Sequence, residues 1–529
     1  MKLCLNFTGY FLSLTLSILL FTGCEKDELI TPGLKKDNTD GIALAPKAPK
    51  GTFFYGLSSS NELIGYTSGN PLQEQSAVSI TGLASGEKVL AIDFRPATGQ
   101  LYGVTTMSRL VTIIPTTGVA TPVGTGFTPA INGALVGFDF NPTVDRIRLV
   151  TNNEQNLRLH PETGGLAAMD GNLNPGDRTV VAVAYTNNFS GAATTTLYDI
   201  DLSDDMLYKQ SPPNAGTLVP VGPLGILATG EGGFDISPDN SVAIAVLFGR
   251  DADDENQEEF SNGNKTRFYY INLETGEATN AGKPDRDIVG VAIPTNPVAY
   301  AIDQSNRLTI FNPENPGSPV KKTIANLQTD EVILGIDMRP ATGQLFALGS
   351  SSRIYVLNMA SGAAAAVGMT AFTPALSGSS FGFDFNPTVD RIRVVSNTGQ
   401  NLRLNPSTGA VAAVDSTLRP GTPNVDAAAY TNNFAGATTT TLYDVDYTTD
   451  KLYRQVPPNL GTLVEVGSLN VDVNSGNGFD IGSTSGTAMG IFTSGSQSKI
   501  YRVNLSTGAA SVMTSFPESV KGFTIGLGF

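Results

Sequence analysis

The sequence predicts an all-β protein, a β-propeller built from ten four-stranded blade-like units in two tandem halves of five. The first observation is duplication: GFDFNPTVDRIR at 137–148 returns letter for letter at 382–393, and RPATGQL at 95–101 returns at 339–345. The second is a shorter repeat within each copy, in which an apolar leading strand recurs roughly every 45 residues, as in four-stranded propeller blades. One duplicated domain therefore fills most of the chain.

Each half is expected to contribute five leading strands. They are predicted at 89–94, 136–140, 181–185, 233–236 and 289–293 in the first copy, and at 333–338, 381–385, 426–430, 478–481 and 522–527 in the second. Small residues such as Gly137, Ala182, Gly233 and Gly290 suit the strand nearest the axis, where blades converge. The chain has 57 Gly and 31 Pro, and no sustained 3.6-residue apolar stripe between 52 and 529, so helix content should be slight.

The closure of the ring has two solutions, two five-bladed propellers or one ring of ten blades. Propellers usually have four to eight blades, which favours two rings. The segment 293–298 resembles the same-blade turn at 94–101, which leaves only about four residues, roughly 13 Å, to cross between rings. We therefore expect a single ten-bladed ring, in which the C-terminal strand completes the N-terminal blade.

The N-terminal region resembles a bacterial lipoprotein signal peptide over residues 1–23. The resemblance implies that Cys24 is diacylated and becomes the first mature residue; an ordinary secretory signal is the alternative. Residues 25–28, Glu-Lys-Asp-Glu, resemble the acidic signal that sends Bacteroidetes lipoproteins to the cell surface, and a solvated charge run is the other interpretation. Residues 24–50 are predicted to form a lipidated, flexible tether, followed by propeller repeats at 51–296 and 297–529.

Composition excludes several classes of function. The formal net charge is −15, so a nucleic-acid partner is not expected. Cys4 and Cys24 are the only cysteines, so signal cleavage leaves no free thiol for catalysis and no disulfide. The single histidine, His160, corresponds to Asn405 in the second copy, which excludes a histidine triad shared by both copies.

The long repeated motif, with the NLRLNP run at 401–406 and the TTLYD runs at 195–199 and 440–444, is similar to a bacterial domain of unknown function, family 4394. The resemblance covers nearly everything from Thr52 to Phe529, as two tandem copies. It implies an extracytoplasmic, β-rich module. It carries over no catalytic residue.

The duplicated motif places two carboxylates beside several arginines. In one interpretation Arg146, Arg148 and Arg158 bind an anion, because alternate residues of a strand share a face and the next strand could bring Arg158 alongside. In the other, which we favour, these arginines pair with Asp139 and Asp145, join blades and cap the 141–144 turn, because buried charges are normally paired. The candidate binding residues of this motif are Asp139, Arg146, Arg148 and Arg158, with Asp384, Arg391, Arg393 and Arg403 in the second copy.

Two further segments are weaker candidates for a binding role. Asn187 and Asn188, with Asn432 and Asn433, follow a leading strand in a polar loop, where turn formation is the competing explanation. The acidic stretch 251–259 lies in a 13-residue insertion of the first copy, and its carboxylate spacing suggests calcium. It lacks the turn glycine of an EF-hand, so a solvated loop is favoured.

The sequence therefore predicts a non-catalytic module of the cell envelope, an outer-membrane lipoprotein exposed at the surface that binds a protein or glycan or acts as an accessory subunit. No cofactor is expected, with calcium the only candidate. The alternative is a hydrolase or lyase acting on glycans through paired carboxylates in the axial channel, with calcium assisting.

Overall fold

The computed structural model describes residues 51–251, 266–474 and 478–529. The predicted signal peptide, Cys24, the tether and nearly all of the acidic insertion lie outside these residues. The described chain forms ten antiparallel sheets of four strands, and the ten predicted leading strands are confirmed as the innermost strand of each sheet. Its helical elements are short 3-10 turns such as Pro213–Ala215 and Pro458–Leu460. No helix in the described part of the chain is long and apolar enough to cross a membrane.

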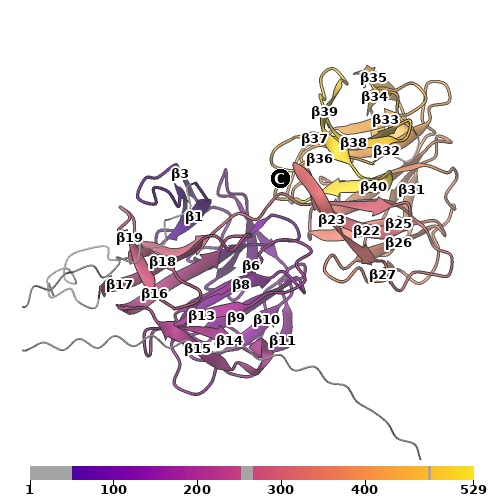
Figure 1. The fold of residues 1–529 in the computed structure, drawn as a ribbon. Helices are drawn as coiled ribbons and strands as arrows, with labels where there is room; N and C mark the ends of the chain where they lie inside the picture. The colour runs from indigo at the N-terminus through magenta and orange to yellow at the C-terminus, as the bar shows by residue number, and fades with distance from the viewer. Residues whose placement is uncertain (1–50, 252–265, 475–477) are drawn as a thin grey trace, which may run out of the picture. The chain divides into compact units, whose positions relative to one another are not determined.

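The first copy forms five blades, each of which runs outward from an inner strand (Figure 1). They are β20 (Ile288–Ala292), β1 (Phe53–Ser58), β2 (Glu62–Thr67) and β3 (Ser76–Ser79); β4 (Val89–Phe94), β5 (Leu101–Thr105), β6 (Leu110–Ile113) and β7 (Ala120–Val123); β8 (Val136–Asn141), β9 (Arg146–Thr151), β10 (Asn156–Leu159) and β11 (Leu166–Met169); β12 (Val180–Tyr185), β13 (Leu197–Asp201), β14 (Met206–Gln210) and β15 (Leu218–Pro223); β16 (Ile226–Ile236), β17 (Ala243–Asp251), β18 (Thr266–Ile271) and β19 (Ala278–Gly282).

The second copy repeats this arrangement. Its blades are β40 (Val520–Ile525), β21 (Ala299–Asp303), β22 (Arg307–Asn312) and β23 (Asn315–Thr323); β24 (Ile333–Arg339), β25 (Gln344–Gly349), β26 (Arg353–Leu357) and β27 (Ala364–Val367); β28 (Phe381–Asn386), β29 (Arg391–Ser396), β30 (Asn401–Leu404) and β31 (Val411–Val414); β32 (Val425–Tyr430), β33 (Leu442–Asp446), β34 (Lys451–Gln455) and β35 (Leu463–Ser468); β36 (Gly478–Ile481), β37 (Ala488–Ser494), β38 (Gln497–Val503) and β39 (Ala510–Phe516).

The chain closes two five-bladed rings, so the expected single ring of ten blades is wrong. Inner strands β20, β4, β8, β12 and β16 pack against one another in a cycle, and β40, β24, β28, β32 and β36 form a second cycle. Each copy supplies the inner strand of its own first blade: β20 pairs with β1, and β40 pairs with β21. Residues 293–298 therefore link two sheets and do not form a turn within one blade.

The inner strands approach one another closely, as the predicted small residues require. A Cβ added at Gly233 would lie 2.6 Å from the Cα of Gly290 on the neighbouring inner strand. In the second ring, a Cβ at Gly522 would lie 2.9 Å from the Cα of Gly335. Around each axis, apolar side chains between adjacent blades form the core: Leu149, Leu157 and Phe140 are fully buried in the first ring. A side chain at Gly233 or Gly522 would therefore clash with the backbone of the adjacent inner strand.

Candidate functional site

A cluster of three aspartates lies at the centre of each ring. Asp93, Asp139 and Asp235 stand on β4, β8 and β16, and one carboxylate oxygen from each lies within 4.8 Å of the others. Asp337, Asp384 and Asp480 form the corresponding cluster of the second ring. All six residues are at most 1% exposed. Substrates in solution therefore cannot reach these carboxylates, which does not favour their use as paired catalytic groups.

Each aspartate joins its blade to the next one. The amide of Phe140 donates to Asp93 Oδ2 at 2.8 Å, and the amide of Tyr185 donates to Asp139 Oδ1 at 3.1 Å. The amide of Ile293 likewise donates to Asp235 Oδ2 at 2.5 Å. In the second ring the amides of Phe385, Tyr430 and Ile525 bind Asp337, Asp384 and Asp480 in the same way.

These contacts identify one residue on each inner strand at the same height along the ring axis, here called the axial level. The residues of this level are Asp93, Asp139, Ala184, Asp235 and Ala292 in the first ring, and Asp337, Asp384, Ala429, Asp480 and Thr524 in the second. The two rings therefore differ at a single position of this level. Thr524 carries a hydroxyl where the first ring has the methyl group of Ala292.

The clusters carry negative charge without a matching positive charge. No lysine or arginine of the described residues forms an ion pair with any of the six aspartates. Burial, followed by the charges of Asp93 and Asp235, raises the pKa of Asp139 well above its usual value. Burial raises the pKa of Asp235 to about 7 and that of Asp480 to about 6. A neutralising proton or cation is therefore required at each axis.

Arg148 does not pair with Asp139, although the two are opposite each other on β8 and β9. Its guanidinium donates to Asp170 Oδ2 at 2.7 Å, to Asn156 Oδ1 at 2.6 Å and to Asn214 Oδ1 at 2.9 Å. The expected pairing is thus wrong, because the Asp139 carboxylate faces the axis and binds the next blade.

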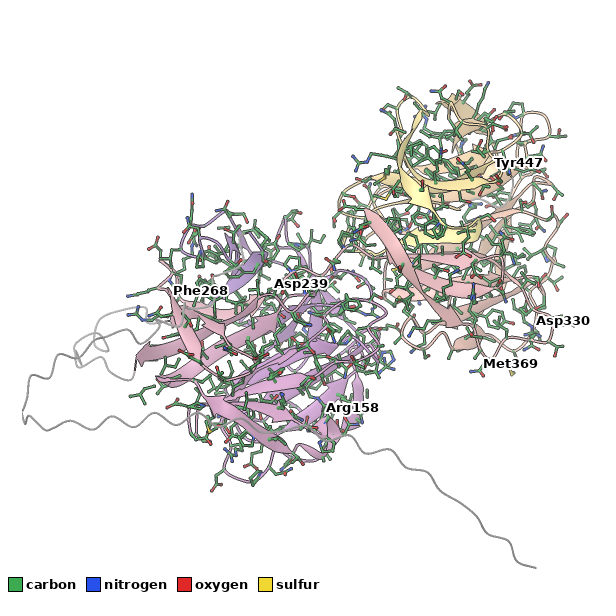
Figure 2. All side chains as sticks on the ribbon, viewed as in Figure 1. Arg158, Asp239, Phe268, Asp330, Met369 and Tyr447 are labelled. Atoms are coloured by element: carbon green, nitrogen blue, oxygen red, sulfur yellow. The ribbon has the colours of Figure 1, made fainter. Side chains whose placement is uncertain are left out.

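Arg158 reaches the same carboxylate from the next strand. It donates two hydrogen bonds to Asp170, at 2.7 and 2.9 Å, and its side chain is 33% exposed (Figure 2). The predicted proximity of Arg148 and Arg158 is therefore confirmed, and a carboxylate of this chain occupies the space between them. In the second copy Arg393 and Arg403 bind Asp415 in the same way.

Asp145 pairs with the other repeated motif, not with the arginines beside it. Arg95 donates to Asp145 through Nε at 2.8 Å and through Nη2 at 2.5 Å, and a third contact joins Arg95 to Glu162 at 3.2 Å. Arg339 and Asp390 form the same pair in the second copy. Arg146 and Arg391 instead donate to the backbone carbonyls of Asp145 and Asp390. The two long motifs thus form one contact between blades.

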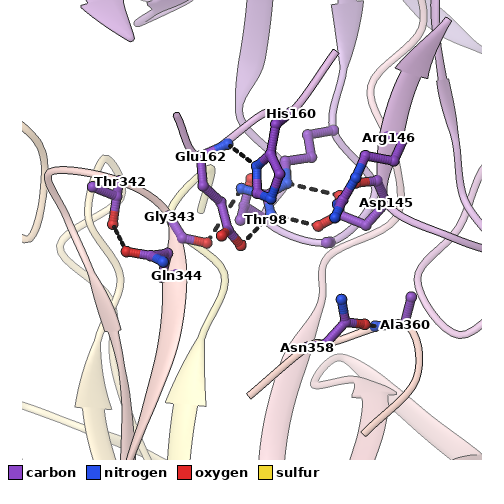
Figure 3. Close-up of polar contacts among 12 residues, drawn as sticks. Thr98, Asp145, Arg146, His160, Glu162, Thr342, Gly343, Gln344, Asn358 and Ala360 are labelled. Atoms are coloured by element: carbon purple, nitrogen blue, oxygen red, sulfur yellow. Dashed lines mark hydrogen bonds and ion pairs between the residues drawn. The ribbon is translucent and has the colours of Figure 1, made fainter. Parts of the chain in front are cut away.

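His160 lies beside this cluster. The amide of Glu162 donates to His160 Nδ1 at 3.4 Å (Figure 3). Burial and the neighbouring Arg146 and Arg95 lower the pKa of His160 to about 4, so the imidazole is neutral at physiological pH.

The asparagine loops are held mainly by local contacts. Asn187 has φ 56° and donates to the carbonyl of Thr194 at 2.9 Å, and Asn432 makes the same bond to Thr439. Asn188 is fully buried and Asn433 is 1% exposed. These positions place Asn188 and Asn433 out of reach of a large ligand, while a binding role for Asn187 and Asn432 stays a prediction.

A polar groove lies in the second propeller. Its volume is about 620 Å³, and the hairpin that joins β37 to β38 forms one wall with Gln497 and Lys499. Glu518 forms part of the opposite wall, and its Oε1 lies 2.5 Å from Lys321 Nζ. Serine, threonine and asparagine complete the lining. In the first copy the corresponding segment carries the 13-residue insertion, so the sequence of this groove wall is not shared by the two copies.

Sequence reasoning missed several of these residues. Asp170 and Asp415 follow a short outer strand and belong to no conspicuous motif. Asp93, Asp139 and Asp235 are each the next-to-last residue of a predicted leading strand, so this recurring aspartate was the available signal. The polar groove arises from a difference between the copies, which a search for shared residues overlooks.

Together these features define a tandem pair of five-bladed β-propellers with buried acidic axes. The chain belongs to the domain of unknown function family 4394, whose model matches residues 62–292 and 307–525. A comparison with curated proteins finds no match.

Several solved structures show weak similarity to the chain. One is the extracellular domain of a protein assigned as a hybrid two-component system from B. thetaiotaomicron, at 10% identity and a TM-score of 0.24, with 87% of this chain and 58% of that chain covered. Another is PorZ, a bacterial surface component of the type-IX secretion system of Porphyromonas gingivalis, at 13% identity, a TM-score of 0.24 and coverages of 87% and 57%. The chain spans less than two thirds of either structure, and likenesses this weak say nothing about function.

Proposed function

We propose that the protein is a non-catalytic binding module of the cell envelope, anchored through Cys24, whose ligand is a glycan held in the groove of the second propeller. The observation that carries the proposal is the contrast between shared and unshared polar residues. The shared aspartates and Arg148 are buried and bonded within the rings, while the open groove is lined by polar side chains of one copy.

The chemistry of the groove supports a glycan as the ligand. Hydroxyl and amide side chains donate and accept hydrogen bonds, as sugar hydroxyls do, and Lys499 adds one strong donor. Phe516 is 4% exposed, so stacking on a sugar ring contributes little. A protein ligand is the other outcome that a binding experiment can return.

Binding without turnover is the expected result for the mature chain. The protein, produced without its signal peptide, is tested against a panel of soluble polysaccharides for both binding and release of reducing ends. A bound polysaccharide should lose roughly tenfold in affinity in the Gln497→Ala, Lys499→Ala double variant, which removes one neutral and one charged hydrogen-bond donor. Lys451→Ala, on an exposed lysine outside the groove, is the matched control and should bind normally. Released product, or binding indifferent to the groove variant, would contradict the proposal.

The proposed localisation of the protein is tested separately in cells. Cys24→Ser should abolish labelling with a fatty-acid analogue and release the protein from the membrane fraction. Replacing Lys26, Asp27 and Glu28 by alanine should leave the protein lipidated but shielded from external protease. If protease still cleaves the triple variant in intact cells, residues 26–28 are not needed for export to the cell surface.

A further inference from the structure

The axis of the first propeller has the composition of a cation site. Asp93, Asp139 and Asp235 present three carboxylates whose nearest oxygens lie within 4.8 Å of one another, in a fully buried setting. A second observation is independent of this clustering: Asp139 Oδ2 is buried and accepts no hydrogen bond, whereas both oxygens of Asp93 and Asp235 bind backbone amides. A buried carboxylate oxygen without a partner is costly unless a proton or metal ion satisfies it.

We propose that the axis of the first propeller binds one Ca²⁺ through Asp93, Asp139 and Asp235. An all-oxygen, anionic ligand set selects a hard cation. Ca²⁺ accepts oxygen ligands in flexible geometry, whereas Mg²⁺ demands near-ideal octahedral geometry and gives up its water reluctantly. Three carboxylates on separate strands in a buried setting therefore favour Ca²⁺ over Mg²⁺.

The first axis is also open at one end. A cavity of about 130 Å³ lies at the start of its inner strands and is lined by Val89, Val136, Gly232 and Val289. Glu231 and Lys88 also line this cavity, so their formal charges offset each other. The cavity lined by the inner strands of the second ring is about 10 Å³. The two rings therefore differ in the size of the hollow among their inner strands.

The second ring provides an internal comparison at the same axial level. Thr524 Oγ1 lies 2.9 Å from Asp337 Oδ1 and 2.9 Å from Asp480 Oδ2. The hydroxyl has one proton, so it donates to one carboxylate and accepts from the protonated form of the other. This hydroxyl bridges two of the three aspartates from within the chain. Ala292 cannot do so in the first ring, which leaves that cluster to an ion.

Calcium binding to the mature chain tests the assignment. After removal of metal with a chelator, titration with CaCl₂ should show one saturable site per chain with a Kd below about 1 mM, within the range of extracellular calcium modules. Asp139→Asn should weaken this site by at least about tenfold, a loss seen even for groups that only support a metal ligand. Asp384→Asn, the same change in the second ring, should leave it unchanged.

An exchange of the two differing residues separates ligation from folding, because all six aspartates remain. Ala292→Thr should weaken binding by at least about tenfold, since it places the hydroxyl of the second ring into the first. Thr524→Ala should raise the count from one ion to two. The chain has a net charge of −15, so loosely held surface ions are expected and Asp139→Asn measures that background. The proposal is overturned if wild-type protein binds no more Ca²⁺ than Asp139→Asn, or if Ala292→Thr binds as tightly as wild type.

Discussion

Replacing Arg148 by alanine should destabilise the first propeller by about 3 kcal/mol, the lower end of the range for breaking a buried ion pair. Arg148 is 2% exposed, and its loss leaves Asn156 and Asn214 without their donor. Asp170 keeps its two bonds from Arg158, which is why the lower end of the range applies. Chemical denaturation followed by circular dichroism measures the loss.

The matched control is Arg158→Ala, which removes the other, partly exposed arginine of the same cluster. Its side chain is 33% exposed, so the loss should be at most about 1 kcal/mol. Arg393→Ala and Arg403→Ala should repeat both results in the second propeller. An unchanged unfolding midpoint for Arg148→Ala, with loss of a sulfate-induced stabilisation that wild type shows, would establish that the arginines bind an anion instead.

Substituting valine for Gly233 should destabilise the first propeller by about 3 kcal/mol or more, because the new side chain forces two inner strands apart. Its Cβ would lie 2.6 Å from Gly290 Cα and 2.8 Å from Val291 N, both backbone atoms that cannot rotate away. Gly176→Val is the matched control, since no atom lies within 4 Å of a Cβ there. Thermal melts of the two variants should differ by several degrees, and equal melts would mean that the ring relaxes freely at Gly233.

Local sequence patterns predicted the inner strand of each blade, but not which strands pair to close each ring. Each predicted leading strand coincides with an inner strand, because the apolar run and its turn are both encoded within about ten residues. Closure depends on the partner of β1, which is β20, far along the chain. The turn-like residues 293–298 carry no information about that distant pairing, and they led to the wrong ring.

The candidate sites were predictable to the extent that sequence neighbours are also spatial neighbours. Arg148 and Arg158 meet because adjacent strands of one hairpin bring Cα partners together. Asp139 was assigned to the nearby arginines because buried charges are normally paired, yet its carboxylate binds the amide of Tyr185 in the next blade. Contacts between blades join residues about 45 positions apart. Over that separation, sequence periodicity predicts how far along the ring axis a residue lies, but not which residue it contacts.

The pairing of β1 with β20 closes the first ring between segments that lie far apart in the chain, and the pairing of β21 with β40 does the same in the second ring. Joining these strands closes a chain segment of roughly 240 residues, which costs about 5 kcal/mol of chain entropy by the (3/2)RT ln n relation. The cost arises once per ring, whereas most contacts between neighbouring blades are of shorter range. Because β20 belongs to the first copy, this closure is complete before any residue of the second copy is needed. As the chain emerges N-terminus first during synthesis, the first propeller can thus reach its native state while the second is still being made.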